Sequence, residues 1–278
     1  MVQLRIRPEL SRLPAPLMAA AAAAGGRAQQ AYAATALARR VALAREECPE
    51  EYQSGKPRLA RLLGEAQVLL EPVRRPRRKV DVATATNPQV VMLLPGFGAH
   101  PMRMRYLARQ MEAAGHVAKR WGLGFNWGPT EQNFDAVEAR LLELHARYGR
   151  KVVLVGWSLG GLYAREIAKR QPQAVAKVVT MGSPFSGSPR ANNVWRAYQF
   201  ITGHSVDAPP VEADLAAKPP VETVALWSAN DGVIAPRCAA GRPGERDRAV
   251  ALRCTHMGFT YDPQVVQTVL AELESTRG

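Results

Sequence analysis

The chain of 278 residues is long enough for one large α/β domain with additions, and 47% hydrophobic residues can supply a sizeable core. This composition excludes collagen-like, coiled-coil and wholly disordered proteins. The net charge of +13 is uneven, because residues 1–85 carry 15 Lys and Arg against 8 Asp and Glu. A basic first third suggests an acidic partner, either an anionic membrane surface or an acidic carrier protein, with a merely basic surface as the alternative. No nucleic-acid-binding signature is present, and we expect no nucleic acid partner.

Residues 1–79 are expected to form an N-terminal helical extension. Composition and leucine spacing predict helices over Ala28–Cys48 and Pro57–Glu71. Residues 72–79 contain two prolines and five cations, which predicts an exposed linker. An alanine-rich run over residues 15–24 follows three arginines, as in a secretory signal, but the run is short and contains a proline. We therefore expect a cytoplasmic protein, with secretion as the alternative, and no transmembrane helix.

Residues 80–278 alternate strand-like and helix-like segments and are expected to form the main domain. This alternation predicts a mostly parallel, doubly wound sheet, in which chemistry gathers at the carboxyl ends of the strands. Residues 186–220 interrupt the alternation with five prolines and one predicted helix over residues 194–203, which predicts an inserted lid. The expected strands are residues 90–94, 117–121, 152–155, 175–180, 221–227 and 249–253. The other expected helices are residues 102–114, 132–148, 162–168 and 263–273.

The stretch Val152–Gly161 carries the strongest motif. Four apolar residues predict a short buried strand, and the residues from Gly156 to Gly160 then match G-x-S-x-G with Ser158 at the centre. In the context of strand, sharp turn and helix, this turn lifts the serine hydroxyl clear of the sheet, and small residues let the two backbones nearly touch. An ordinary strand-to-helix turn is the alternative, so the interpretation depends on the partners of Ser158.

A nucleophilic serine needs a base, and the base needs a carboxylate behind it. His256 follows the last predicted strand and precedes the last predicted helix, which makes it the candidate base. Asp231 follows the strand predicted over residues 221–227 and is the candidate acid, with a simple Asp-Gly turn as the alternative. The chain order serine, aspartate, histidine is one of the known triad orders. Packing, surface or at most supporting roles are expected for the other histidines, His100, His116, His145 and His204.

The charge that develops on the substrate oxygen needs two backbone amides that point at it. The amide of Leu159, directly after Ser158, is one candidate. The second candidate is the amide of Phe97 in the loop over residues 95–98, because glycines on both sides allow this amide to turn inward.

As an ordered set, these motifs resemble the α/β-hydrolase superfamily, and specifically bacterial lipase- or esterase-like serine hydrolases. The resemblance covers about residues 85–275 and implies an α/β-hydrolase fold with ester or acyl-transfer chemistry and neither cofactor nor metal. Pro95-Gly96 stands where many lipases have His-Gly, and Trp157 stands where many have histidine, which leaves the substrate open. The set consists of the loop at 94–97, Trp121–Pro129, residues 156–168, Gly182–Phe185, residues 228–234 and residues 255–258.

The expected function is a serine hydrolase that cleaves a small-molecule or lipid carboxylic ester through an acyl-enzyme. An acyltransferase or thioesterase acting on a carrier-bound acyl chain is one alternative, and a non-catalytic binding protein on a hydrolase scaffold is another. The acyl length, the alcohol group and the oligomeric state are left open. Whether Cys238 and Cys254 form a disulfide is also left open. Such a bond would tether the loop that carries Asp231 to the loop that carries His256.

Overall fold

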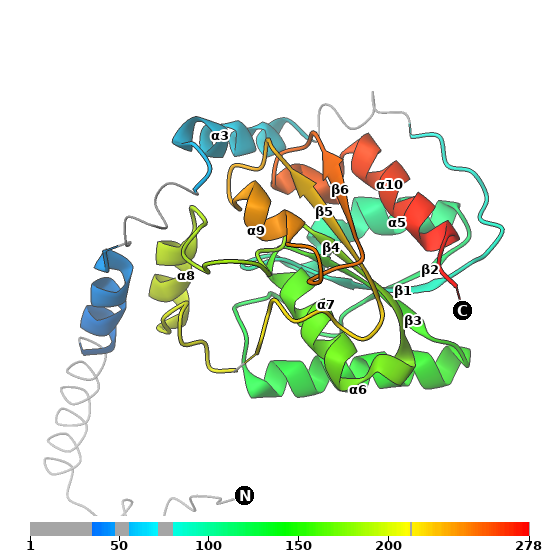
Figure 1. Cartoon of the computed structure of the whole chain (residues 1–278), viewed down its shortest axis with the longest axis horizontal. Coiled ribbons are helices and arrows are strands. Elements are labelled where there is room, and N and C mark those ends of the chain that lie inside the picture. Colours follow the sequence, from blue (N-terminus) through cyan, green and yellow to red (C-terminus); the bar gives the residue numbers. More distant parts are fainter. Residues whose placement is uncertain (1–34, 48–55, 72–79, 212, 278) are drawn as a thin grey trace, which may run out of the picture.

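The described residues of the computed structural model are 35–47, 56–71, 80–211 and 213–277, and they contain one six-stranded sheet (Figure 1). Its strand order is β2-β1-β3-β4-β5-β6, and every neighbouring pair is parallel. The order reverses direction between β1 and β3, and such a reversal opens a crevice at the carboxyl ends of the strands. The strands are β1 (Val90–Leu94), β2 (Val117–Arg120), β3 (Val152–Trp157), β4 (Val175–Met181), β5 (Glu222–Ser228) and β6 (Arg248–Leu252).

Helices cover both faces of the sheet, as Figure 1 shows. α5 (Arg105–Ala113) and α10 (Pro263–Glu274) lie on one face, and α6 (Glu131–Tyr148) and α7 (Leu159–Arg170) lie on the other. β1 supplies both cores, because successive side chains of a strand point to opposite faces. Val91 and its alternate neighbours join the core with α5 and α10, whereas Val90 and its alternate neighbours join the core with α6 and α7. The predicted doubly wound α/β-hydrolase fold is therefore confirmed.

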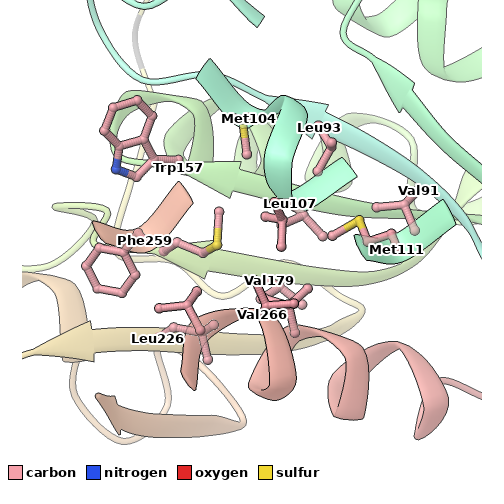
Figure 2. Packing of buried hydrophobic residues seen from close by; sticks show 14 of the residues in the cluster. Val91, Leu93, Met104, Leu107, Met111, Trp157, Val179, Leu226, Phe259 and Val266 are labelled. Atoms are coloured by element: carbon pink, nitrogen blue, oxygen red, sulfur yellow. The ribbon is translucent and has the colours of Figure 1, made fainter. Parts of the chain in front are cut away.

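The core on the α5 and α10 face reaches the carboxyl end of the sheet. In Figure 2, Trp157, at the end of β3, and Phe259 lie at the same end of this cluster. Both side chains are almost fully buried, with exposed fractions of 3% for Trp157 and 0% for Phe259. Phe259 belongs to the 3₁₀ helix η6 (Met257–Thr260), which the sequence did not predict as a helix. The hydrophobic core therefore extends to the carboxyl end of the sheet.

Several elements differ in extent from their predictions. The helix expected over residues 102–114 begins as a 3₁₀ turn, η4 (Pro101–Met104), before α5. The helix expected over residues 57–71 is divided into α3 (Leu59–Gly64) and the 3₁₀ helix η2 (Glu65–Leu70). A short helix that was not predicted, α9 (Pro236–Ala240), follows the loop after β5.

Part of the expected N-terminal extension lies within the described residues. Residues 35–45 are helical, inside the range predicted over Ala28–Cys48, while the linker predicted over residues 72–79 lies outside the described residues. In Figure 1, this helix lies beside α8 (Trp195–Thr202), the helix of the segment inserted between β4 and β5. Within the described ranges, no helix combines the length and apolarity needed to cross a bilayer.

The inserted segment is tied down at both ends. Arg165, fully buried on α7, donates to the carbonyl oxygens of Leu215, Ala216 and Ala217 as the segment returns to the sheet. Near the other end, the main-chain N–H of Asn193 donates to the carbonyl oxygen of Val233 at 2.9 Å. The segment expected as a lid is therefore anchored to the body of the domain.

Candidate active site

Ser158 occupies the turn between β3 and α7. Its backbone has φ 54° and ψ −122°, and it is the one non-glycine residue with positive φ among those the structure describes. Such a backbone conformation costs roughly 1–3 kcal/mol and persists only where its surroundings impose it. The Ser158 N–H donates to the carbonyl oxygen of Met181, at the end of β4, over 2.8 Å.

The glycines of the motif allow the tight packing around this turn. A Cβ atom on Gly156 would lie 2.4 Å from the carbonyl oxygen of Gly160. A Cβ atom on Gly160 would lie 2.1 Å from the carbonyl oxygen of Leu94, at the end of β1. Neither position has room for a larger residue, so the motif fixes how closely β3, α7 and the end of β1 approach.

Asp231 and His256 form a buried pair. Asp231 Oδ2 lies 2.8 Å from His256 Nδ1, and the side chains are 1% and 4% exposed. The other carboxylate oxygen, Oδ1, accepts hydrogen bonds from the N–H groups of Val233 and Ile234 at 2.8 and 2.7 Å. An aspartate held in this way accepts the Nδ1 proton, which leaves Nε2 of the imidazole as the free acceptor.

The electrostatic surroundings of His256 favour its protonated form. Complete burial lowers the pKa of His256, but the Asp231 charge, the hydrogen bond to Asp231 and the Glu65 charge together raise this pKa above its ordinary value of 6.5. The His256 ring therefore binds a proton more readily than a free imidazole does.

The serine turn and the acid–base pair converge through the end of β4. Met181 accepts the Ser158 N–H, and the next residue, Gly182, donates its N–H to Leu226 on β5 at 2.9 Å. A Cβ atom on Gly182 would lie 3.0 Å from Asp231 Oδ2. On the histidine side, the indole Nε1 of Trp157 donates to the carbonyl oxygen of His256 at 3.0 Å. These contacts bring all three predicted side chains to the same edge of the sheet.

The loop after β1 places Phe97 beside this edge. Asn126, which is fully buried, donates from Nδ2 to the carbonyl oxygen of Pro95 at 2.8 Å and accepts from the Gly98 N–H through its main-chain oxygen at 2.7 Å. Gly98 has φ 66°. In the described loops and turns, neither the N–H of Phe97 nor that of Leu159 donates a hydrogen bond to another main-chain group. Both amides are therefore available as donors.

An apolar cavity of about 140 Å³ opens at this position. Phe97, Ser158 and Leu159 line it together with inserted-segment residues that include Trp195 and Tyr198. A dry cavity of about 150 Å³ accommodates a molecule the size of benzene. Burial raises the pKa of Tyr198 to about 12, so its hydroxyl is neutral at physiological pH. Among the described residues that line the cavity none is a cation, and the surface beside Ser158 is mainly apolar.

The family model described as "alpha/beta hydrolase fold" matches residues 89–233, more than half of the chain. The chain belongs to this family. Over 113 residues, this α/β hydrolase is 32% identical to the pimeloyl-[acyl-carrier protein] methyl ester esterase of Vibrio parahaemolyticus serotype O3:K6. That match covers 39% of this chain and 42% of the relative, so the chain aligns with less than half of that protein.

The fold of this α/β hydrolase is similar to that of Bacillus licheniformis lipase BlEst2. For the propeptide form the TM-score is 0.54 at 18% identity, covering 72% of this chain and 53% of that one. For the mature form the TM-score is 0.51 at 16% identity, covering 71% of this chain and 96% of that one. At these identities the likeness concerns the fold.

Each of the other four histidines of this α/β hydrolase makes a hydrogen bond within the fold, through its ring or its main chain. His116 is buried and accepts the N–H of Gln89 at Nδ1, and burial lowers its pKa despite the charge of Glu274. His145 Nδ1 lies 2.9 Å from the carbonyl oxygen of Arg150. His100 and His204 lie in loops, where His100 accepts the Met102 N–H and the His204 N–H donates to Thr202.

Sequence reasoning missed three side chains that hold the site together. They are Asn126, which fixes the loop of Phe97, Trp157, which binds the main chain of His256, and Glu65, which lies in η2. Their partners lie 31, 99 and 191 residues away, and no local pattern marks such contacts. Asn126 lies within Trp121–Pro129, one of the segments that carry the family resemblance, but nothing in that segment indicates its partner.

The two cysteines near the acid and base loops do not form a disulfide. Cys238 and Cys254 are both free and buried. Burial is the largest cause of the raised pKa of each thiol, so neither is a reactive thiolate. The described residues contain no group of three or more His, Cys, Asp and Glu side chains placed to hold a metal ion.

Proposed function

We propose that this α/β hydrolase is a serine carboxylic-ester hydrolase with Ser158 as nucleophile, His256 as base and Asp231 as the orienting acid. The observation that carries the proposal is the buried 2.8 Å contact between Asp231 and His256 at the sheet edge where Ser158 lines an apolar cavity. Comparable pairs activate a serine in unrelated hydrolase folds.

In the proposed reaction, Ser158 Oγ attacks the ester carbonyl while His256 Nε2 takes the hydroxyl proton. Asp231 holds the imidazole in the required tautomer and stabilises the imidazolium. The amides of Phe97 and Leu159 donate to the oxyanion of the tetrahedral intermediate. His256 then protonates the departing alcohol, and water, deprotonated by the same ring, releases the acyl group.

The cavity supports a substrate with an apolar acyl group. Its wall next to Ser158 consists mainly of aromatic and aliphatic side chains, including Phe97, Trp195 and Tyr198. With the inserted segment in its present position, a volume near 140 Å³ fits an acyl group of roughly six carbon atoms. Butanoate to octanoate esters are therefore the expected substrates.

A second candidate is hydrolysis of an ester whose acyl chain is attached to an acidic carrier protein. Two observations favour it: the basic first third of the chain and the matched Vibrio relative, which is named as an esterase of a carrier-bound methyl ester. Thioesterase or acyltransferase action on a carrier-bound chain would use the same proposed triad.

The decisive experiment combines labelling with substrate profiling. A fluorophosphonate probe should label the protein at Ser158, located by peptide mapping, and a series of p-nitrophenyl esters from acetate to palmitate should give maximal kcat/KM between butanoate and octanoate. Absence of labelling would favour a non-catalytic binding protein. Much faster turnover of an acyl-carrier ester than of the matching free ester would favour the second candidate, and product formed with an alcohol acceptor in place of water would indicate acyl transfer.

A further inference from the structure

Glu65 is a buried carboxylate in the N-terminal extension, outside the proposed triad. It begins η2, directly after α3, and its exposed fraction is 7%. A carboxylate in the interior is costly unless hydrogen bonds compensate for the lost water. In the described residues no cation forms an ion pair with Glu65, and all three of its hydrogen bonds come from main-chain N–H groups.

The three donors belong to two loops. The acid loop follows β5 and carries Asp231, and the base loop follows β6 and carries His256. Glu65 Oε1 accepts the N–H of Gly232 at 2.9 Å and the N–H of His256 at 2.7 Å, and Oε2 accepts the N–H of Met257 at 2.9 Å. Gly232 is the residue after Asp231, and Met257 is the first residue of η6. One carboxylate therefore joins the main chains on either side of the Asp231–His256 hydrogen bond.

The backbone of α3 also packs directly on the acid loop. A Cβ atom at Gly232 would lie 2.4 Å from the carbonyl oxygen of Arg61 and 2.7 Å from the N atom of Leu62. The side chain of Asn193, in the inserted segment, donates to both Gly232 and Pro57 across the same junction at 2.8 and 3.0 Å. The close approach requires glycine after Asp231 and brings Glu65 within reach of both loops.

We infer that Glu65 is a positioning residue that holds the acid and base loops in register, which makes the extension a structural part of the active site. The expected effect of Glu65 on catalysis rests on the proposed function. Three amide donors are satisfied by a carboxylate, whereas the amide of glutamine would turn an N–H₂ group toward at least one of them. Removing the carboxylate leaves buried N–H groups without acceptors and lets the two loops move apart.

The charge of Glu65 has a second, electrostatic effect on His256. The acidic groups that act on this ring are Asp231, after β5, and Glu65, on η2, while the nearby Cys254 thiol is neutral because burial raises its pKa. Both carboxylates raise the pKa of His256 against the lowering effect of burial. Loss of the Glu65 charge should therefore lower this pKa and move the acid limb of kcat/KM to lower pH.

The test compares Glu65→Gln and Glu65→Ala with Asp81→Asn, a control that removes an exposed carboxylate near the same end of the chain. In both Glu65 variants we expect kcat to fall roughly 10- to 100-fold, as for small misplacements of reacting groups, with a smaller change in KM and an acid limb at lower pH. The control should show none of these changes. Glu65→Gln keeps the side-chain volume and carries the test if Glu65→Ala does not fold, as judged by circular dichroism.

Two further measurements separate this inference from the proposed function. Fluorophosphonate labelling of the unmodified protein tests Ser158 alone. The pKa of His256, followed by NMR of its ring protons, tests the influence of Glu65 without any need for turnover. A folded Glu65→Gln protein with unchanged kcat, pH profile and His256 pKa would overturn the inference, whereas an unlabelled wild-type protein with a lowered His256 pKa in the variant would support the role of Glu65 and reject the hydrolase proposal.

Discussion

The indole Nε1 of Trp157 donates a hydrogen bond to the backbone carbonyl oxygen of His256 over 3.0 Å. Their ring centroids are 5.5 Å apart. Trp157 ends β3 and directly precedes Ser158, so one side chain connects the serine turn to the histidine loop. His256 is thus held through its ring by Asp231 and through its main chain by Trp157 and Glu65.

Replacing Trp157 with Phe should keep an aromatic wall while removing this donor. We expect kcat to fall by about tenfold through displacement of the base, with KM little changed. The free energy of unfolding should fall by roughly 1–3 kcal/mol, because a buried carbonyl loses its partner. Steady-state kinetics on p-nitrophenyl butanoate and urea denaturation measure both effects. An unchanged kcat in a destabilised protein would limit Trp157 to a packing role.

Ser158→Ala should abolish nearly all ester hydrolysis and leave the fold intact. Loss of a triad serine lowers kcat by roughly 10⁶-fold in a comparable enzyme. Removal of the hydroxyl should also end labelling by the fluorophosphonate probe. A variant that keeps a tenth of the wild-type turnover would show that another residue is the nucleophile.

Asp231→Asn should lower kcat by roughly 10⁴-fold, because the amide no longer selects the tautomer that leaves Nε2 free. The matched control is Asp135→Asn, at an exposed position of α6, which should retain full activity. Both variants can be assayed with the same short-chain ester. A loss of only a few-fold in Asp231→Asn would assign the orienting role to another carboxylate.

The raised pKa of His256 determines in which direction activity and stability change with pH. The base works only when neutral, so kcat/KM should fall as the pH drops through a midpoint above 6.5, the ordinary histidine value. In Asp231→Asn the largest raising influence is gone, and the midpoint of the residual activity should move to lower pH. For stability, the protonated ring favours the folded state, so its contribution is complete below about pH 6.5 and is lost as the pH rises through the raised pKa.

The sequence could predict the fold because strand-forming runs and helix-forming segments alternate along residues 80–278, apart from the proline-rich insertion over residues 186–220. It could also predict where Ser158, Asp231 and His256 would lie, since each lies in the loop or turn that follows a strand, and strands of a parallel sheet end at one edge. Their catalytic roles remain proposals. The glycine spacing around Ser158 was informative because a strand-to-helix turn is a local structure.

The part of the site supplied by Glu65 could not be predicted from the sequence. Its partners Gly232 and His256 lie 167 and 191 residues away, and nothing in the helical pattern over residues 57–71 distinguishes a buried carboxylate from an exposed one. The segment is divided into α3 and η2 where it packs against the acid loop, with Arg61 and Leu62 next to Gly232. Tertiary contacts of this kind override local helix propensity.

Gly160→Ala and Gly64→Ala form a matched pair that tests the packing of the serine turn. A Cβ atom at position 160 would lie 2.1 Å from the carbonyl oxygen of Leu94, whereas one at position 64 meets nothing within 4 Å. Overpacking at position 160 should lower the free energy of unfolding by roughly 1–3 kcal/mol and reduce kcat. Gly64→Ala should be neutral or stabilise the protein by up to about 1 kcal/mol. Equal unfolding midpoints would contradict the close approach at Gly160.

The inserted segment and the extension meet at Arg190. Its Nη2 lies 2.6 Å from Glu46 Oε2 and its Nε lies 2.6 Å from Asp207 Oδ2, while the guanidinium lies 4.8 Å from the ring of Trp195. Trp195 is part of the cavity wall. The ion pair with Glu46 therefore connects the extension to a side chain that lines the cavity beside Ser158.

Glu46→Gln should loosen this connection and shift the substrate preference toward longer acyl groups. An ion pair of this exposure contributes up to about 1 kcal/mol, which corresponds to a two- to fivefold change in the ratio of kcat/KM for decanoate to that for butanoate. Glu47→Gln is the control, because Arg190 binds only the main-chain carbonyl of Glu47. The series of p-nitrophenyl esters measures the ratio in all three proteins. If Glu46→Gln slows all esters equally, the contact supports folding and does not set chain length.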